Sequence, residues 1–458
     1  MLKQSSFRNF LGRYIKDNGI KYTVNKVVGQ LRPASILDDY RLIKSMYNGC
    51  KSSGGPKYVQ LDVTGECDNS CLACWCNSPL LKSDFRDSRK HFLDYNVLTK
   101  TIDELSRMRT REITISGGGE PFKYEKLLEA VEYIKNKNIR CTLYTNFIAA
   151  NKDSVLKLVE AKLDYLVVSV WAGSQQTYNL LHPGIDEKSF EKVKENLLFL
   201  SAQNSRPLVR IHNVINSLNC HEINLMLDFA QEAGADEVSF SVVDIIPGMT
   251  DSLLLTALQR DKLINDLKEL KPSKVKVVNL NDFIRRLTSE GYLRGVYDKE
   301  CVQENPCYTG WLFSRIDSQG NVNPCLKSHK ICVGNIYEKS FSEIWNSSSQ
   351  LEFRRNCRHI NKNKDYFSVV GNSLNNEIGC LRFCDDALIN MAMHRKFSFY
   401  PSIKILRAIV ILQNKVTAIF LKIRLFRKIV YLFFIVFLYS LFCKARKLFR
   451  KSAIFPGE

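Results

Sequence analysis

Short apolar runs alternate with longer stretches of helical periodicity between residues 58 and 243. The apolar runs are rich in β-branched residues and comprise Tyr58–Val63, Glu112–Ser116, Arg140–Phe147, Tyr165–Val170, Leu208–Val214 and Glu237–Val243. The helical stretches between them are Tyr95–Arg109, Tyr124–Asn136, Lys152–Ala161, Glu187–Ala202 and Glu222–Ala233. Short buried strands that alternate with such helices predict βαβ units on a parallel sheet with right-handed crossovers.

Six strands fit a partial (β/α)6 barrel or an open sheet, because a closed barrel of this kind needs eight. Either arrangement places a ligand site at the carboxyl ends of the strands. We therefore expect an α/β fold with a TIM-like partial barrel, followed by a small cysteine-rich domain and a basic, apolar helical tail. The expected parts are a helical lead-in over residues 1–56, the barrel over 57–250, a helical bridge over 251–300, the cysteine-rich domain over 301–395 and the tail over 396–458.

The composition is that of a folded protein with an unusual number of thiols. The chain has 458 residues, of which 45% are hydrophobic and 25% charged, so wholesale disorder is excluded. Residues 1–12 lack the apolar segment of a signal peptide, so we expect a cytoplasmic protein. A disulfide framework is not expected in that compartment, and the 15 cysteines are better interpreted as metal ligands or reactive thiols.

The basic charge is concentrated in the tail. Residues 396–458 hold 13 Lys and Arg and one acidic residue, out of a net charge of +19 for the whole chain. These charges flank an apolar run, Ile429–Cys443, which is shorter than the roughly 20 residues of a spanning helix. We expect peripheral association with the inner face of the cell membrane, with a single span as the alternative. Nucleic-acid binding is not expected, because no separate polar, basic stripe is present.

The first strand leads directly into three closely spaced cysteines, Cys67, Cys71 and Cys74. Three thiolates at this spacing suit an iron–sulfur cluster and leave one iron open to a small molecule. A zinc site is the alternative, although zinc usually takes four ligands in paired spacings and a fourth is absent unless Cys76 serves. At the end of the second strand, Gly118-Gly119-Glu120-Pro121 supplies glycines that let a backbone approach a ligand closely.

Together the cysteine loop and the Gly-Gly-Glu-Pro turn resemble the radical SAM superfamily over about residues 58–244. The resemblance implies that the three cysteines hold a 4Fe–4S cluster, that S-adenosylmethionine (SAM) chelates the fourth iron, and that the turn binds the SAM amino group. It further implies SAM contacts from Thr145, Asn146, Ser169 and Arg210. One departure is that Ala73 stands where the family usually has an aromatic residue, and Trp75 follows the third cysteine.

Seven further cysteines lie between residues 301 and 384 among few hydrophobic runs, which is typical of a small domain organised by metal. A structural zinc module is the alternative. The segment Cys307, Gly320 and Cys325 resembles the SPASM extension of radical SAM enzymes. This resemblance implies one auxiliary 4Fe–4S cluster on Cys301, Cys307, Cys325 and Cys384. A second cluster stays open, because the expected partner cysteines are missing: Cys357 and Cys380 are either remnants or bind a second cluster with His359 or Cys332.

The expected activity is reductive cleavage of SAM to a 5′-deoxyadenosyl radical that abstracts hydrogen from a substrate, with electron transfer through the auxiliary cluster. The resemblance implies a reductant protein such as flavodoxin or ferredoxin. The substrate is a peptide, a sugar or another small molecule, and the tail favours a lipid-linked glycan. No general base is identifiable. The rival hypothesis is a non-catalytic zinc or iron–sulfur scaffold at the membrane.

Overall fold

The computed structural model describes residues 40–46, 50–82, 91–270, 273–359, 363–371 and 378–398. The chain divides into two compact units, one of Gly55–His394 and one of Met1–Gly54 with Arg395–Glu458. In the second unit, residues 40–46 are helical. Most of the expected lead-in and nearly all of the expected tail lie outside the described residues.

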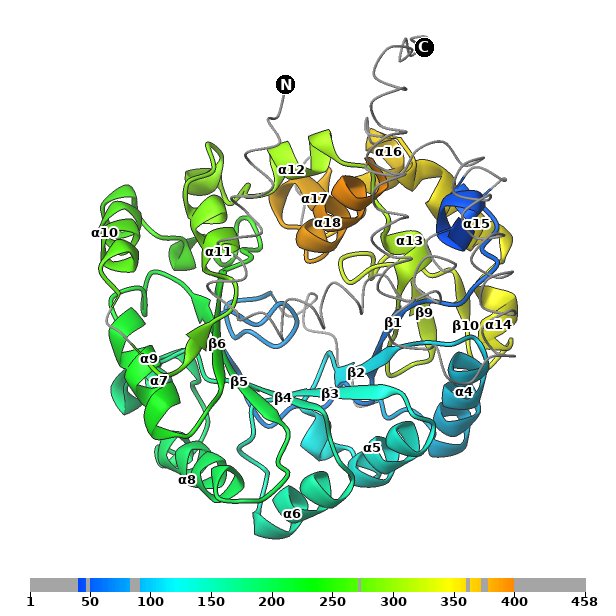
Figure 1. Cartoon of the computed structure of the whole chain (residues 1–458). Coiled ribbons are helices and arrows are strands. Elements are labelled where there is room, and N and C mark those ends of the chain that lie inside the picture. Colours follow the sequence, from blue (N-terminus) through cyan, green and yellow to red (C-terminus); the bar gives the residue numbers. More distant parts are fainter. Residues whose placement is uncertain are drawn as a thin grey trace, which may run out of the picture. The chain divides into compact units, whose positions relative to one another are not determined.

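The Gly55–His394 unit is built on one sheet with the strand order β10-β9-β8-β1-β2-β3-β4-β5-β6-β7. Six strands pair in parallel in chain order: β1 (Tyr58–Asp62), β2 (Glu112–Ser116), β3 (Arg140–Thr145), β4 (Tyr165–Ser169), β5 (Leu208–Ile215) and β6 (Glu237–Val242). Each lies on one of the apolar runs, so the predicted parallel sheet is confirmed. The strands form an arc that does not close into a barrel (Figure 1).

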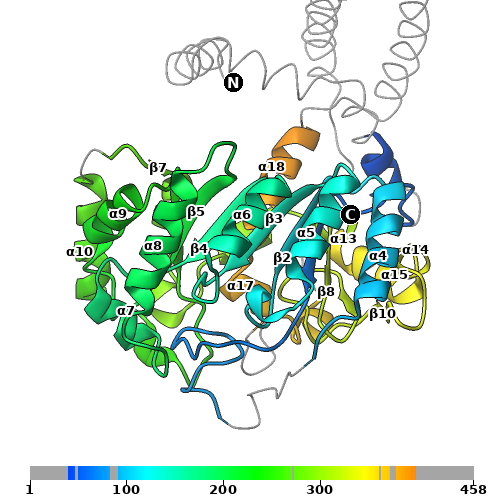
Figure 2. The same ribbon diagram turned by 90° about the horizontal axis from the view of Figure 1, so that it is seen from below.

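The crossover helices cover the convex side of this arc (Figures 1 and 2). They are α4 (Tyr95–Arg107), α5 (Leu127–Asn136), α6 (Lys152–Glu160), α7 (Gln175–Leu181), α8 (Ser189–Ser201) and α9 (Ile223–Glu232). Helix α4 shows why they pack there, since Leu98, Ile102 and Leu105 recur at helical spacing and are fully buried. The opposite face of the sheet carries polar side chains: Arg210 and His212 of β5 alternate with buried Val209 and Ile211.

Short strands extend the sheet at both edges. Strand β7 (Lys276–Val277) pairs with β6, and β8 (Phe313–Ile316) pairs in parallel with β1. Strands β9 (Asn321–Asn323) and β10 (Gly334–Asn335) continue from β8 in antiparallel pairing. A buried ion pair of 2.5 Å between Arg315 and Asp62 joins β8 to β1. The cysteine-rich segment is therefore attached to the first strand of the parallel sheet.

Apart from the helical residues 40–46, the other α-helices lie after β6 in the chain. They are α10 (Ala257–Lys268), α11 (Leu280–Leu287), α12 (Lys299–Glu304), α13 (Thr309–Leu312), α14 (Phe341–Ile344), α15 (Ser348–Cys357), α16 (Lys364–Phe367), α17 (Gly379–Arg382) and α18 (Ala387–Ser398). Within the described ranges, none of the helices has the length and apolar character needed to cross a bilayer.

Candidate functional site

The loop after β1 brings Cys67, Cys71 and Cys74 to the carboxyl end of the sheet. The amide of Cys74 donates to the carbonyl of Cys71 at 3.1 Å, which closes a tight turn. The amide of Leu72 donates to the carbonyl of Leu181 at 2.9 Å and so attaches the loop to the end of α7. All three thiols are half-buried in one loop.

Two of the three thiols, those of Cys67 and Cys71, resist ionisation in the protein alone. Burial raises the pKa of Cys67 to about 12, and the charges of Glu120, Asp68 and Cys74 add to the effect. Burial, followed by the nearness of Cys74 and Cys67, likewise raises the pKa of Cys71. Three thiolates therefore need a compensating positive charge here, which iron ions would supply.

The Gly-Gly-Glu-Pro turn packs directly on this loop. The amide of Glu120 donates to the carbonyl of Glu66 at 2.8 Å, and the Cys76 thiol donates to the carbonyl of Gly118 at 3.2 Å. A Cβ atom at Gly119 would lie 2.1 Å from the oxygen of Glu66. Only glycine permits this approach, so the glycine is required by the packing of the turn against the cysteine loop.

The carboxylate of Glu120 is the centre of a polar cluster. It is 3% exposed and accepts hydrogen bonds from the Thr145 hydroxyl at 2.5 Å, the Asn146 amide at 2.7 Å and the Phe122 amide at 3.0 Å. Asn146 in turn donates its side-chain amide to Asp68 at 2.7 Å. Burial raises the pKa of Glu120 to about 7 despite these donors. The structure thus brings Glu120, Thr145 and Asn146 together and adds Asp68, which the sequence motifs did not identify.

Two buried polar side chains near the loop lack partners among the described residues. They are the amide of Asn69, within the loop itself, and the hydroxyl of Tyr178 in α7. Tyr178 is fully buried, and the charges of Cys71, Asp68 and Glu120 add to the burial that raises its pKa. Unsatisfied polar groups are costly when buried, so their presence fits a site completed by a polar ligand. No motif in the sequence marks Tyr178.

The two remaining predicted SAM contacts differ in position. Ser169 is the last residue of β4 and, like Thr145, lies at the carboxyl ends of the strands. Arg210 lies near the start of β5, where its guanidinium pairs with Glu237 at 2.6 Å and stacks on Tyr165 at 4.8 Å. Glu237 and Tyr165 are the first residues of their strands. The structure therefore places Arg210 towards the amino ends of the strands, away from the carboxyl ends where Glu120 lies.

A second set of cysteines lines a single pocket in the cysteine-rich segment. The thiol-bearing residues of this pocket are Cys301, Cys307, Cys325, Cys380 and Cys384. The set contains the four expected auxiliary ligands and adds Cys380 as a fifth. Cys357 is not among the lining residues; it is fully buried, and its carbonyl accepts a bond from the amide of Cys307 at 3.1 Å.

The pocket has the donor set of a metal cluster. Burial raises the pKa of Cys301 to about 11 and also raises the pKa of Cys384, so bound thiolates again require a cationic partner. Within the described residues, no group of three or more His, Cys, Asp or Glu side chains is arranged to hold a single metal ion. A cluster of several irons is bound through thiolates that do not share one ion, so the five cysteines are compatible with it.

Comparison with protein families gives two matches, one over each set of clustered cysteines in whole or in part. Residues 61–230 match the radical SAM superfamily, and residues 307–367 match the SPASM iron–sulfur cluster-binding domain. The AdoMet-dependent heme synthase of Methanosarcina barkeri is 24% identical over 65% of this chain and 84% of its own length. The PqqA peptide cyclase of Gluconobacter oxydans is 21% identical over 71% of this chain and 90% of its own length.

Solved structures share the fold. Streptococcus suis SuiB bound to S-adenosylmethionine gives a TM-score of 0.54 at 15% identity, covering 76% of this chain and 79% of SuiB. The protein anSMEcpe with bound AdoMet gives a TM-score of 0.53 at 16% identity, covering 78% of this chain and 99% of that one. Residues 61–230 are therefore a radical SAM domain and residues 307–367 a SPASM domain, and the protein is an enzyme whose cofactors are SAM, a 4Fe–4S cluster and auxiliary iron–sulfur centres.

Proposed function

We propose that this enzyme cleaves SAM reductively and uses the resulting 5′-deoxyadenosyl radical to abstract hydrogen from a peptide substrate. The observation that carries the proposal is the Glu120 carboxylate, which is buried directly against the three-cysteine loop. When bound, the cluster supplies the electron that breaks the carbon–sulfur bond of SAM. The chain's own residues bind and orient the reactants around that bond.

The contacts support the following residue roles. Cys67, Cys71 and Cys74 hold the cluster, and Glu120 accepts N–H groups from the amino end of SAM. The bonds from Thr145 and Asn146 fix the carboxylate in one orientation. Gly118, Gly119 and Pro121 form the turn that carries it, and Ser169 is the proposed contact to the ribose at the neighbouring strand end. Arg210 receives no SAM contact in this proposal.

When bound, an auxiliary cluster would supply an electron acceptor for the substrate radical in our proposal. Its ligands are Cys301, Cys307, Cys325 and Cys384, and the fifth cysteine of the pocket, Cys380, is not required. All five surround one pocket, which favours one auxiliary cluster over two.

A peptide is the proposed substrate because of the relatives. The curated relatives include a peptide cyclase, and the solved structures include SuiB bound to a precursor peptide, with a TM-score of 0.50. The structure of anSMEcpe with a bound peptide has a TM-score of 0.51. The expectation of a lipid-linked glycan depended on the tail, which lies outside the described residues. Product analysis with peptide and glycan candidates separates the two classes.

The decisive test is SAM turnover by anaerobically reconstituted protein with dithionite, or with a flavodoxin or ferredoxin as the physiological reductant. We expect 5′-deoxyadenosine and iron–sulfur absorption bands. Cys71→Ala should abolish turnover and keep the auxiliary cluster, whereas Cys141→Ala, at a buried thiol outside both sites, should keep turnover. Absence of 5′-deoxyadenosine from the fully loaded wild-type protein would support the non-catalytic scaffold instead.

We also propose that the basic tail holds the enzyme at the inner face of the cell membrane. Its support is the sequence alone, in which Lys and Arg flank the apolar run Ile429–Cys443. The full chain should sediment with anionic phosphatidylserine vesicles, and a chain lacking residues 399–458 should stay in the supernatant. Equal sedimentation of both chains would refute the anchor.

A further inference from the structure

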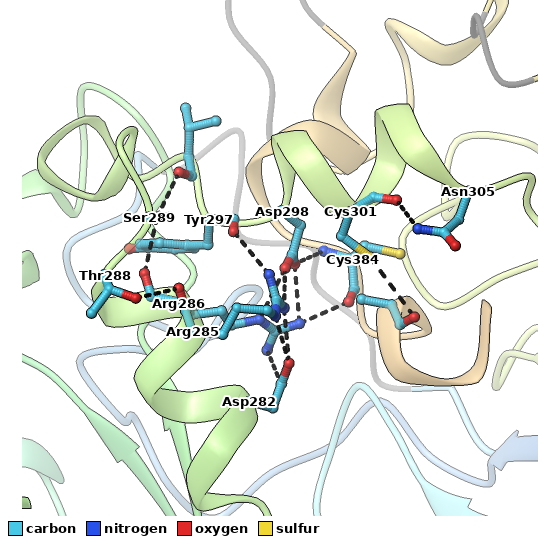
Figure 3. Close-up of polar contacts among 12 residues, drawn as sticks. Asp282, Arg285, Arg286, Thr288, Ser289, Tyr297, Asp298, Cys301, Asn305 and Cys384 are labelled. Atoms are coloured by element: carbon cyan, nitrogen blue, oxygen red, sulfur yellow. Dashed lines mark hydrogen bonds and ion pairs between the residues drawn. The ribbon is translucent and has the colours of Figure 1, made fainter. Parts of the chain in front are cut away.

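One buried carboxylate joins the two segments that carry auxiliary cysteines. Asp298 is 0% exposed and stands directly before α12, which contains Cys301. Its carboxylate accepts a hydrogen bond from the backbone amide of Cys384 at 2.7 Å (Figure 3). The main chains are paired at the same place, since the amide of Asp298 donates to the carbonyl of Leu381 at 3.1 Å. Asp298 therefore fixes the segment of Cys384 relative to the helix of Cys301.

Arg286 of α11 binds both Asp298 and Cys384. Its guanidinium donates to Asp298 at 3.2 and 3.0 Å and also to the carbonyl of Cys384 at 2.8 Å (Figure 3). Both backbone polar atoms of Cys384 are thus bound by one side-chain pair, which we call the Arg286–Asp298 clamp. Arg285 adds a third donor to Asp298 at 2.6 Å, and both arginines also pair with Asp282.

The residues on either side of Cys384 are held as well. The guanidinium of Arg286 lies 4.2 Å from the ring centroid of Phe383, and the ammonium of Lys327 lies 4.7 Å from it. Lys327 also pairs with Asp385 at 3.6 Å and with Asp244, just beyond β6, at 2.5 Å. Three consecutive residues around the thiol of Cys384 are therefore fixed by charged groups.

The Arg286–Asp298 clamp is expected to add little net stability to the fold. Buried ion pairs lose hydration that their mutual attraction barely offsets, and well-packed apolar residues are often at least as stable. A buried pair that satisfies both backbone groups of one residue does what an apolar contact cannot, because it fixes that residue in direction as well as position. The two carboxylates of Asp282 and Asp298 balance the charges of Arg285 and Arg286, so the network adds no net charge beside the pocket.

We propose that the Arg286–Asp298 clamp is the positioning device of the auxiliary cluster, holding the thiol of Cys384 in the pocket and keeping the charge beside the cluster balanced. The proposal rests on the ligand role of Cys384 in the proposed function. Asp298→Asn leaves the arginines in excess, so the cluster's reduction potential should become more positive. Arg286→Gln leaves the carboxylates in excess, so the potential should become more negative. Both variants should also lower auxiliary iron by at least half, because the Cys384 segment loses one of its anchors.

The experiment uses the full chain with Cys71→Ala to silence the first cluster, reconstituted without oxygen. Iron, acid-labile sulfide and the midpoint potential by electron paramagnetic resonance are measured. The matched control is Asp236→Asn, because Asp236 likewise accepts two bonds from one arginine, Arg206, and one from a backbone amide, that of Val209. We expect this control to match the parent in iron and potential.

Unchanged iron and potential in both clamp variants would overturn the proposal, and so would shifts of the same sign with full iron. If either single variant fails to fold by circular dichroism, the charge-balanced double variant Asp298→Asn/Arg286→Gln is measured for iron loss. Failure of the double variant to fold, while Asp236→Asn folds, makes the clamp a folding element and also overturns the proposal. Cys384→Ala is measured in parallel. Full auxiliary iron in that variant would refute the ligand assignment of the proposed function rather than the clamp.

Discussion

Replacement of Glu120 by glutamine tests the proposed SAM site most directly. The change keeps the shape of the side chain and removes its charge, while the Thr145 and Phe122 donors can still bond to the remaining oxygen. The second oxygen becomes an NH2 group, which faces the amide of Asn146 and cannot accept its bond. A hydrogen bond to a charged group contributes about 1.5–3 kcal/mol, so SAM affinity should fall roughly 10- to 150-fold.

The same variant should change the pH dependence of SAM binding. The pKa of Glu120 is raised to about 7 by burial, so the carboxylate becomes protonated as the pH falls below about 7. A protonated carboxyl is a poorer acceptor for the amino group of SAM, and wild-type affinity should fall up to about tenfold per pH unit below that point. Glu120→Gln has no such titration, so its weaker affinity should stay level between pH 6 and 8.

The free energy of unfolding of the ligand-free protein should depend on pH in the opposite direction, rising as the pH falls. The pKa is raised from 4.5 in the unfolded chain to about 7 in the folded one, so the folded state binds the proton more tightly. This contribution to the free energy of unfolding is complete below pH 4.5 and is lost as the pH rises through 7. Its size is about 3 kcal/mol. In Glu120→Gln this part of the pH dependence should disappear.

Equilibrium dialysis of SAM against anaerobically reconstituted protein at pH 6, 7 and 8 gives the affinities, and denaturant unfolding at pH 5 and 8 gives the stabilities. Glu129→Gln is the matched control, because Glu129 is exposed and pairs with the neighbouring Lys126 at 3.0 Å. It should reproduce the wild-type profiles. A Glu120→Gln variant that binds SAM within twofold of wild type, with the wild-type pH profile, would refute the placement of SAM against this carboxylate.

Three further outcomes are expected. Tyr178→Phe removes a buried hydroxyl that has no partner among the described residues, and SAM affinity measured by dialysis should fall roughly 2- to 10-fold. Tyr292→Phe is the control, because the hydroxyl of Tyr292 is similarly buried, and this variant should bind SAM with wild-type affinity. Cys380→Ala should retain full auxiliary iron in a colorimetric assay, and Cys384→Ala should lose it. The reverse result would assign Cys380 as the cluster ligand in place of Cys384. Arg210→Gln removes the charged partner of Glu237 and leaves it the Tyr165 hydroxyl as a donor, so the free energy of unfolding should fall by about 1–3 kcal/mol with SAM affinity unchanged. A large loss of SAM binding would return Arg210 to the SAM site.

Local patterns were sufficient for much of the architecture. The six strands and five of the six crossover helices, all except α7, were predictable because apolar residues recur with a period of two or of about 3.6, and burial depends directly on that period. The extensions of the sheet were not predictable in this way. Strands β7, β9 and β10 have only two or three residues, too few to show any periodicity.

The resemblance to radical SAM enzymes marked Glu120, Thr145 and Asn146 as separate SAM contacts, and the structure shows that Thr145 and Asn146 both bind the Glu120 carboxylate. The position of Arg210 was harder to judge. A residue near the start of its strand lies at the amino end of the sheet, away from a site at the carboxyl end. Arg210 is near the start of β5. Tyr178 gave no signal, since an aromatic residue in a helix is usually part of a core.

By itself, the sequence determined the two sets of cysteines, the Gly-Gly-Glu-Pro turn and the order of strands and helices, because spacing along the chain is sufficient for each of these. Only the tertiary structure decided that Cys380 joins the auxiliary pocket and that Asp298 and Arg286 hold Cys384 from 86 and 98 residues away. Such contacts depend on where packed strands and helices bring distant residues, and no local periodicity records that. The chemistry of this enzyme is therefore visible in its motifs, whereas the precision of its sites arises from packing.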